Sequence, residues 1–236
     1  MRIKNGDFIK RGDRVMPVKF NQYWTIDFER IDEYEKFMIR EFIPGINKLG
    51  IHIVAGWTVL IGGYSDIIIE GVANDLELLE KALRDIKFRQ LSDALQDYIK
   101  NYKTKVLVGT GQKEDYSRDV KKNTVKFSQM WDVLSKKKAA YRDYVNDTYY
   151  PCLEKLGIQI ANEWEVLIGD GPRTLCEGRA VDIESSSLIR NLQREKFQKA
   201  KEGLKHFIEN YESRVLIFHI QKIVGYKSAS YEVITS

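Results

Sequence analysis

Apolar and polar residues follow two periodicities along the chain, and these predict a regular series of strands and helices. In the segment 18–24, apolar residues alternate with mostly polar ones, which predicts a strand. Apolar residues then recur at helical spacing through 28–42, after Asp27, a suitable N-cap, and Pro44 is expected to end this helix. A strand is therefore followed by a helix.

The next segments complete one structural unit. A long apolar strand is predicted at 51–61, followed by a glycine-rich turn at 62–66 and another strand at 67–73. Helical spacing resumes after Asn74 or Asp75, either of which can cap a helix, and the unit closes with a short strand at 105–108. The predicted order is β-α-β-β-α-β.

The same unit occurs twice in the chain. The sequence Val-Lys-Phe-Asn-Gln-Tyr-Trp at 18–24 recurs as Val-Lys-Phe-Ser-Gln-Met-Trp at 125–131, an offset of 107. The offset becomes 109 towards the end of the unit, where Asn-Tyr at 101–102 matches Asn-Tyr at 210–211. We infer an internal repeat with a two-residue insertion in the second copy.

Each repeat has the element order of the ferredoxin-like fold, a four-stranded antiparallel sheet with both helices on one face. Strands two and three carry apolar residues on both faces, so the face without helices also has to be buried. We therefore predict an α+β fold in which two ferredoxin-like repeats pack sheet to sheet as an α+β barrel. The predicted boundaries are an N-terminal extension at 1–16, repeat 1 at 17–109, a polar linker at 110–124, repeat 2 at 125–219 and a C-terminal tail at 220–236, in which 231–234 is a candidate extra strand.

Composition narrows the functional classes. Of 236 residues, 43% are hydrophobic and 31% charged, and the net charge of +4 is too small for a nucleic-acid-binding surface. No apolar run is long enough to cross a membrane, and the polar start lacks the features of a signal peptide. We expect a cytoplasmic protein that binds neither nucleic acid nor membrane, with two free cysteines.

The strand sequence Gly-Ile-His-Ile-Val-Ala-Gly-Trp at 50–57, followed by Gly-Gly-Tyr-Ser-Asp at 62–66, resembles the NIPSNAP proteins of the dimeric α+β barrel superfamily. The second copy departs from this pattern with Glu163 before Trp164. The resemblance implies a superfamily that includes cofactor-free monooxygenases, polyketide cyclases and haem proteins similar to chlorite dismutase. It implies a fold and leaves the activity open.

Two residues on strands are candidates for catalysis because their equivalents in the other repeat differ. His52 lies within an apolar strand, where a half-buried imidazole can act as a general base, and its equivalent is Gln159. Tyr23 becomes Met130 in repeat 2. A single active site in one repeat would produce this asymmetry. An ordinary hydrogen-bonded histidine and an exposed tyrosine would produce it equally.

Glu70 is a third catalytic candidate. It lies on a strand among apolar neighbours, an environment that is expected to raise the pKa of a carboxyl group. Its equivalent, Glu177, is also a glutamate, which favours a structural role. A cross-sheet pair with Lys19 or Lys126 is the alternative explanation.

Amides and indoles recur at matching positions in the two repeats. Gln22 with Trp24, and Gln129 with Trp131, are candidates for lining a pocket for a planar ligand. The alternative is that these side chains fill the same packing position twice and belong to the core.

Metal and cofactor signals are weak. The three histidines offer no i, i+4 pair, so no metal site and no cofactor are predicted. A haem protein is the less favoured alternative, in which His206, on the last predicted helix, would be the axial ligand.

Two hypotheses of different class remain. The first is a small-molecule enzyme, such as a cofactor-independent oxygenase or isomerase, with a pocket in one repeat. The second is a non-catalytic scaffold that holds a ligand or supports assembly. Because an added C-terminal strand would leave an edge free to pair, a homo-oligomer is also expected.

Overall fold

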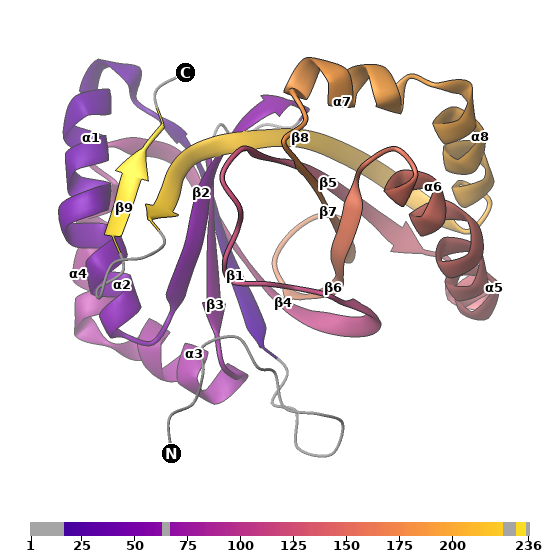
Figure 1. Cartoon of the computed structure of the whole chain (residues 1–236). Helices are drawn as coiled ribbons and strands as arrows, with labels where there is room; N and C mark the ends of the chain where they lie inside the picture. The colour runs from indigo at the N-terminus through magenta and orange to yellow at the C-terminus, as the bar shows by residue number, and fades with distance from the viewer. Residues whose placement is uncertain (1–16, 63–66, 224–229, 235–236) are drawn as a thin grey trace, which may run out of the picture.

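The computed structural model describes residues 17–62, 67–223 and 230–234, and it shows a β-barrel between two layers of helices (Figure 1). The N-terminal extension lies outside the described residues, as does the first hairpin turn apart from Gly62. The strands are β1 (Val18–Ile26), β2 (His52–Ile61), β3 (Ile67–Ala73), β4 (Ile99–Glu114), β5 (Thr124–Val133), β6 (Gln159–Ile168), β7 (Thr174–Val181), β8 (Ile208–Ile223) and β9 (Ser230–Val233). The helical segments are η1 (Phe28–Arg30), α1 (Ile31–Phe37), η2 (Met38–Phe42), α2 (Ile43–Lys48), α3 (Leu76–Arg84) and α4 (Ile86–Leu95) in repeat 1, and η3 (Ser135–Lys137), α5 (Lys138–Tyr144), η4 (Val145–Tyr149), α6 (Tyr150–Glu154), α7 (Ser185–Leu192) and α8 (Glu195–Leu204) in repeat 2.

Strand pairing closes the barrel. Repeat 1 contributes the order β2-β3-β1-β4 and repeat 2 the equivalent order β6-β7-β5-β8. The two sheets join where β4 pairs with β6 and where β2 pairs with β8, all antiparallel. This arrangement confirms the predicted fold class, an α+β barrel built from two ferredoxin-like repeats.

Side chains alternate across each strand, so each of β1 to β8 contributes to the barrel interior and to a core under the helices. On β1, Phe20 and Trp24 face the helices of repeat 1, whereas Tyr23 faces the interior of the barrel. We call the three groups of buried residues the repeat 1 core, between sheet and helices α1 to α4, the repeat 2 core, between sheet and helices α5 to α8, and the barrel interior. Figure 1 shows the two helical layers on opposite sides of the barrel.

The first long helix of each repeat continues through its proline, contrary to the expectation that Pro44 ends it. A π-helical turn, η2, precedes the proline, and in it the Ile43 N–H donates to the carbonyl of Met38, five residues back. Pro44 then stands in the first turn of α2, where a missing N–H costs no hydrogen bond. Pro151 follows η4 in the same way in repeat 2.

The last strand of each repeat is much longer than predicted. β4 extends to Glu114, so the first five residues of the predicted linker are strand, and Glu114 pairs with Asn162 on β6. β8 continues to Ile223 and pairs with β9, at 230–233, in the segment that was predicted to be the tail. In Figure 1, β9 lies beside the first helices of repeat 1.

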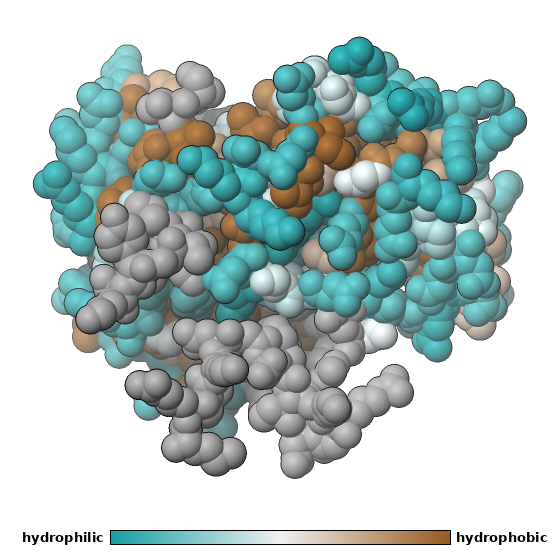
Figure 2. Space-filling model, in the orientation of Figure 1, coloured by the Kyte–Doolittle hydropathy of each residue, from teal (hydrophilic) through white to brown (hydrophobic). Residues whose placement is uncertain are grey.

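The surface mixes polar and apolar regions. Figure 2 shows apolar residues exposed between the two helical layers on a face that is otherwise mostly hydrophilic. Among the described residues, no helix is long and apolar enough to cross a membrane.

Candidate functional site

Four charged side chains form a ring in the barrel interior, and each repeat supplies one lysine and one glutamate from equivalent positions. Lys19 on β1 donates to Glu70 Oε1 on β3 at 2.7 Å and also pairs with Glu177 on β7. Lys126 on β5 donates to Glu70 Oε2 at 2.5 Å and pairs with Glu177 as well. Each lysine therefore bridges both carboxylates, and the ring joins the two repeats across the barrel.

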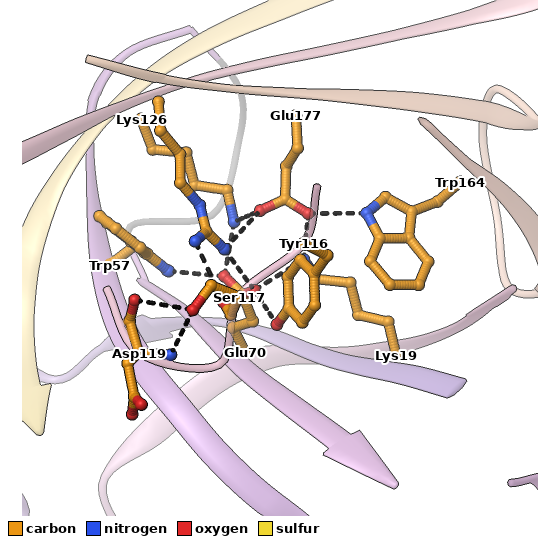
Figure 3. Close-up of polar contacts among 10 residues, drawn as sticks. Lys19, Trp57, Glu70, Tyr116, Ser117, Asp119, Lys126, Trp164 and Glu177 are labelled. Atoms are coloured by element: carbon orange, nitrogen blue, oxygen red, sulfur yellow. Dashed lines mark hydrogen bonds and ion pairs between the residues drawn. The ribbon is translucent and has the colours of Figure 1, made fainter. Parts of the chain in front are cut away.

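Neutral donors complete the coordination of the two carboxylates (Figure 3). Trp57 Nε1 donates to Glu70 at 3.0 Å, and Trp164 Nε1, its equivalent, donates to Glu177 at 2.8 Å. The Tyr116 hydroxyl donates to Glu70 Oε1 at 2.6 Å. Tyr116 comes from the segment between β4 and β5, so part of the predicted polar linker is inserted into the barrel.

A fifth charge breaks the symmetry. Arg179 on β7 lies 3.8 Å from Glu70 and 3.9 Å from Glu177, and its equivalent in repeat 1 is Val72. Its Nη1 donates to the carbonyl of Ser117 at 3.1 Å. With three cations and two carboxylates, this group carries a net charge of +1 and fixes the inserted segment at the end of the barrel.

The environment of Glu70 corrects the expectation that its pKa is raised. Burial acts in the expected direction, but Lys126, Lys19 and Arg179 together hold the pKa of Glu70 well below 4.5. Burial lowers the pKa of Lys19 to about 8, although both glutamates act in the opposite direction. Because both oxygens of Glu70 accept ion pairs, the geometry favours the cross-sheet pairing with Lys19 and Lys126 over a role as general base.

Tyr23 also faces the barrel interior, away from the ion-pair ring. Burial raises its pKa to about 12, and its hydroxyl accepts a hydrogen bond from Asn21 Nδ2 at 3.2 Å. Lys105 Nζ lies 5.6 Å from the centre of its ring and donates to the sulfur of Met130, the equivalent of Tyr23, at 3.6 Å. Tyr23 is therefore a buried neutral phenol.

The structure does not bring His52 and Tyr23 together. His52 is the half-buried first residue of β2 and pairs with Val72 on β3, whereas Tyr23 pairs with Ile68 on the other side of that strand. Four residues along a strand correspond to about 13 Å. The two candidates thus occupy different parts of repeat 1.

The predicted amide and indole set is divided between two cores. Gln22 and Trp24 lie in the repeat 1 core, and Gln129 and Trp131 lie in the repeat 2 core, all fully buried. Trp131 stacks on Tyr211 with a centroid distance of 6.2 Å. These residues line no common pocket, but the repeat 2 pair belongs to a second polar cluster.

A row of polar side chains crosses the sheet of repeat 2 on the face that the helices cover. Strand register places Glu163 on β6 opposite Cys176 on β7, Cys176 opposite Gln129 on β5, and Gln129 opposite Ser213 on β8. We call these four residues the polar row. Since neighbouring strands lie about 4.8 Å apart, the row spans about 14 Å.

Hydroxyl groups surround the carboxylate at one end of the row. Glu163 is 2% exposed, and its Oε2 accepts hydrogen bonds from the hydroxyls of Tyr141, at 2.6 Å, and Tyr150. Thr110, on the long strand β4, donates to Oε1 at 2.9 Å. Within the described part of the chain, no cation is paired with Glu163.

Gln129 occupies the middle of the row. Its Oε1 accepts hydrogen bonds from Tyr149, the last residue of the π turn η4, and from Tyr211 at 3.0 Å. Its Nε2 lies 4.0 Å from the sulfur of Cys176. The π turn therefore places Tyr149 over the row, with Tyr150 beside it.

Repeat 1 lacks this chemistry at the same positions. The equivalent row is Gly56, Ile69, Gln22 and Thr104, so the carboxylate and the thiol are replaced by a glycine and an aliphatic residue. The residue equivalent to Thr110 is His219 on β8, which reaches the helices of repeat 1, stacks on Tyr34 at 5.8 Å and has its pKa lowered to about 4 by burial.

The residues of repeat 2 do not fit the haem alternative. His206 is exposed in the turn after α8, where its backbone carbonyl accepts a hydrogen bond from Lys137 at 2.6 Å. The residues of α8 that face the core are Phe197, Ala200 and Leu204. In the part of the chain that the structure describes, no group of three or more His, Cys, Asp or Glu residues is arranged to hold a metal ion.

Sequence reasoning did not identify the polar row. Glu163 was noted only as a departure from the repeat 1 pattern, and the informative signal is a charge in the middle of an apolar strand where repeat 1 has Gly56. Arg179 gives the same signal, because it replaces Val72. Tyr116 gives no comparable signal, since a lone aromatic residue in a polar segment has many explanations.

Comparisons with known proteins identify the fold. No protein-family model matches the sequence, and no curated protein matches it. The structure of a candidate monooxygenase from Fusobacterium nucleatum is similar, with a TM-score of 0.61 at 10% identity over 86% of this chain and 93% of that chain. An anthrone oxidase-like protein matches with a TM-score of 0.53 at 12% identity, over 89% of this chain and 94% of that one.

Chlorite dismutase-like structures match as well. A candidate chlorite dismutase has a TM-score of 0.55 at 11% identity, over 86% of this chain and 95% of that chain. At such identities a structural likeness is evidence of fold and does not establish an activity. The chain therefore has the ferredoxin-like α+β barrel fold of these monooxygenase-like and chlorite dismutase-like structures.

Proposed function

We propose that the protein is a small-molecule enzyme of the cofactor-independent oxygenase or isomerase type, and that Glu163 in the repeat 2 core abstracts a proton from the bound substrate. The likeness to a candidate monooxygenase and to an anthrone oxidase-like protein supports this class. The NIPSNAP resemblance of the strand at 50–57 is part of the same proposal and leaves the reaction open.

One observation carries the proposal: Glu163 is a buried carboxylate whose contacts are hydroxyl groups. A buried carboxylate needs hydrogen bonds or a cation to offset its lost hydration. Glu70 has both, and it is held in a ring of cations. Glu163 accepts hydrogen bonds from Tyr141, Tyr150 and Thr110, so no ammonium group competes with a substrate proton for its oxygens.

The surrounding phenols are suited to stabilise the product of proton abstraction. Burial raises the pKa of Tyr141 and of Tyr150, so both remain protonated hydrogen-bond donors. When the C–H bond of a carbon acid breaks, its proton moves to Glu163 and its electron pair stays on the substrate as an enolate or phenolate. Once Glu163 is protonated, it accepts hydrogen bonds from the surrounding hydroxyls less strongly. These hydroxyls can then donate to the new oxyanion.

Access to Glu163 passes the long strand β4. Thr110 is exposed, yet its hydroxyl reaches the buried carboxylate. The residues after it are held to the helices of repeat 2, because Lys113 pairs with Glu154 at 2.9 Å and Gln112 accepts from Asn146 at 3.1 Å. Displacement of this segment would open the polar row to a substrate.

Anthrone is the probe for the proposed reaction, because it is an acidic carbon acid and an anthrone oxidase-like protein shares the fold. Oxygenation consumes one O2 per anthrone and yields anthraquinone and water, with O2 as the oxidant. An isomerase-type enzyme would instead exchange the acidic protons with D2O without O2 uptake, which NMR detects. Acetylacetone serves as a second carbon acid for the exchange measurement.

Glu163→Gln tests the role of the base, and Glu165→Gln is the matched control, because Glu165 is exposed on the same strand. We expect Glu163→Gln to lower the rate of oxygenation or exchange by about two orders of magnitude or more, and the control to retain the rate. Equal rates in both variants, or no catalysed exchange or O2 uptake with either probe, would contradict the proposal.

His52 and Tyr23 remain proposed contributors, although strand pairing places both in repeat 1 and the polar row lies in repeat 2. His52→Ala and Tyr23→Phe, measured in the same assays, separate a second site in repeat 1 from a purely structural role. A loss of rate in either variant at unchanged stability would place chemistry in repeat 1.

A second function, a non-catalytic scaffold, is favoured by one observation. The barrel interior is filled by the ion-pair ring and by packed aromatic side chains, so it has the character of a core. Native mass spectrometry of the purified protein distinguishes the two functions, because a ligand-holding scaffold would retain a small molecule that is released unchanged on denaturation.

A further inference from the structure

A cleft opens beside the polar row, between the last two helices of repeat 2 and the strands β5 and β8. Its volume is about 170 Å3, close to that of about six molecules of liquid water. Apolar side chains make up most of its wall, among them Phe127, Ile189, Leu192, Phe197 and Val215. Ser213, the solvent-side end of the polar row, and Tyr211 also line it.

Two cations, Lys201 and Arg214, line this cleft, and Arg214 is paired with Glu212 at 3.4 Å. Lys201 on α8 places its ammonium group 4.6 Å from the centre of the Tyr211 ring. Within the described residues it forms no ion pair, because the neighbouring Glu202 pairs with Lys205 at 2.7 Å. Burial and Lys205 lower the pKa of Lys201, the direction expected for an ammonium group that lacks an anionic partner.

From this arrangement we propose that the cleft binds a small apolar carboxylate, with the acid group on Lys201 and the hydrocarbon or aromatic part against the apolar wall that includes Leu192 and Val215. The cation supplies the charge complementarity, and the aromatic and aliphatic walls remove the apolar part from water. The volume limits the buried part to a single ring or a short chain. Repeat 1 has Ser92 at the position of Lys201, so its equivalent surface lacks that ammonium group, although Lys105 stands at the position of Arg214.

A second opening lies at the same end of the polar row. A cavity of about 500 Å3 is lined by Asp132, Gly171, Pro172, Asn210, Tyr211 and Glu212. Tyr211 therefore borders both openings, while its hydroxyl holds Gln129 in the row. The carboxylate site is a binding site in its own right and does not depend on proton abstraction by Glu163.

Binding can be measured without turnover, by isothermal titration calorimetry or ligand-observed NMR with benzoate and hexanoate. Benzamide and hexanamide are the uncharged counterparts, and inorganic phosphate tests whether a bare anion suffices. We expect the carboxylates to bind more tightly than the amides and than phosphate. Equal binding of benzoate and benzamide, tighter binding of phosphate, or no binding of either carboxylate would overturn the proposal.

Two substitutions locate the site. Lys201→Gln is expected to weaken benzoate binding roughly five- to tenfold, whereas Lys199→Gln should not, because Lys199 is 77% exposed on the same helix and pairs with Glu195. Leu192→Trp should fill the cleft and abolish binding while the circular dichroism spectrum is retained. Unchanged binding in Lys201→Gln or in folded Leu192→Trp would contradict the assignment. Failure of these experiments leaves the test of Glu163 untouched, since that test measures chemistry on anthrone.

Discussion

Lys19 and Glu177 stand 158 positions apart in the sequence and form an ion pair in the centre of the barrel, one from each repeat. Both side chains have no exposed surface. The pair therefore reports directly on the relative placement of the two sheets. Because Lys126 and Glu70 make the reciprocal contact, the ring is satisfied only when the repeats are in this register.

Removal of one lysine is predicted to destabilise the fold strongly. In Lys19→Met the methylene volume is largely kept, but Glu70 and Glu177 lose a shared cation while remaining buried. We expect the free energy of unfolding in urea to fall by about 3–5 kcal/mol. Arg84→Gln, which removes an exposed i, i+4 pair with Glu80, is the control and should leave the free energy of unfolding unresolved from wild type. A loss no larger than the control's would show that the ring contributes nothing.

The ion-pair ring also predicts how the stability of the folded protein depends on pH. The pKa of Glu70 is lowered in the folded protein relative to 4.5, so the unfolded chain takes up a proton first as the pH falls. The contribution of Glu70 is thus present above pH 4.5 and is lost progressively below it. We expect denaturant midpoints measured from about pH 7 to about pH 3 to fall more steeply for wild type than for Glu70→Gln. Parallel curves would argue against a charged Glu70 in the folded state.

The sequence was sufficient to predict the fold because its apolar and polar residues follow clear periodicities and the same pattern occurs in both repeats. Alternation in 18–24, helical spacing after Asp27 and the shared register of the repeats all lead to the same topology. The Asp27 and Asp75 caps are confirmed, since Asp27 accepts from the Glu29 N–H at 3.3 Å and Asp75 from the Leu78 N–H at 2.7 Å. The lengths of β4 and β8 were not predictable, because their C-terminal parts pair with β6 and β2 of the opposite repeat, which the local sequence does not show.

The candidate site was predicted only in part. The pairing of Glu70 with Lys19 and Lys126 was one of the alternatives, because all three lie on strands whose order was known. The polar row was not predicted, because it depends on the strand register across three strand pairs and on the helices that cover the sheet. Glu163 became a candidate only when Tyr141 and Tyr150, from the preceding helices, were found on its carboxylate.

Tyr116 is predicted to anchor the segment between the repeats. Its hydroxyl donates to Glu70 at 2.6 Å, and its ring packs edge-on against Trp164 at 5.1 Å. Tyr116→Phe keeps the ring and removes the hydroxyl, which should lower the free energy of unfolding by about 1–3 kcal/mol. Tyr98→Phe is the control, because Tyr98 is half-buried and stacks on Phe37 without contacting a buried carboxylate in the described part of the chain. An equal effect of both substitutions would show that the hydrogen bond to Glu70 adds no stability.

Gly56 explains why the carboxylate of the polar row has no counterpart in repeat 1. A Cβ atom at Gly56 would lie 2.9 Å from Ile69 Cδ1 and 3.1 Å from Ile220 Cβ, so the position has no room for a side chain. We expect Gly56→Ala to lower the free energy of unfolding by about 1–3 kcal/mol through overpacking. Thr58→Ala, on the same strand, adds no atoms and serves as the control. If Gly56→Ala were neutral in urea unfolding, space could not be the reason for the asymmetry between the repeats.

Self-association is the remaining prediction. Among the described strands, β9 is the last in the sheet order and pairs through one edge with β8, so its other edge has backbone groups that a second chain can pair with. Large apolar side chains are also exposed at equivalent ends of β2 and β6, with Leu60 at 44% and Leu167 at 43% exposure. We expect light scattering after size-exclusion chromatography to give a mass that is a multiple of 27.5 kDa. The double variant Leu60→Ser and Leu167→Ser, compared with wild type over a dilution series, separates the two surfaces. A shift of the variant towards monomer assigns the contact to the exposed ends of β2 and β6. An unchanged oligomer assigns it to β9. Monomer alone at every concentration of the wild-type protein would show that neither surface supports association.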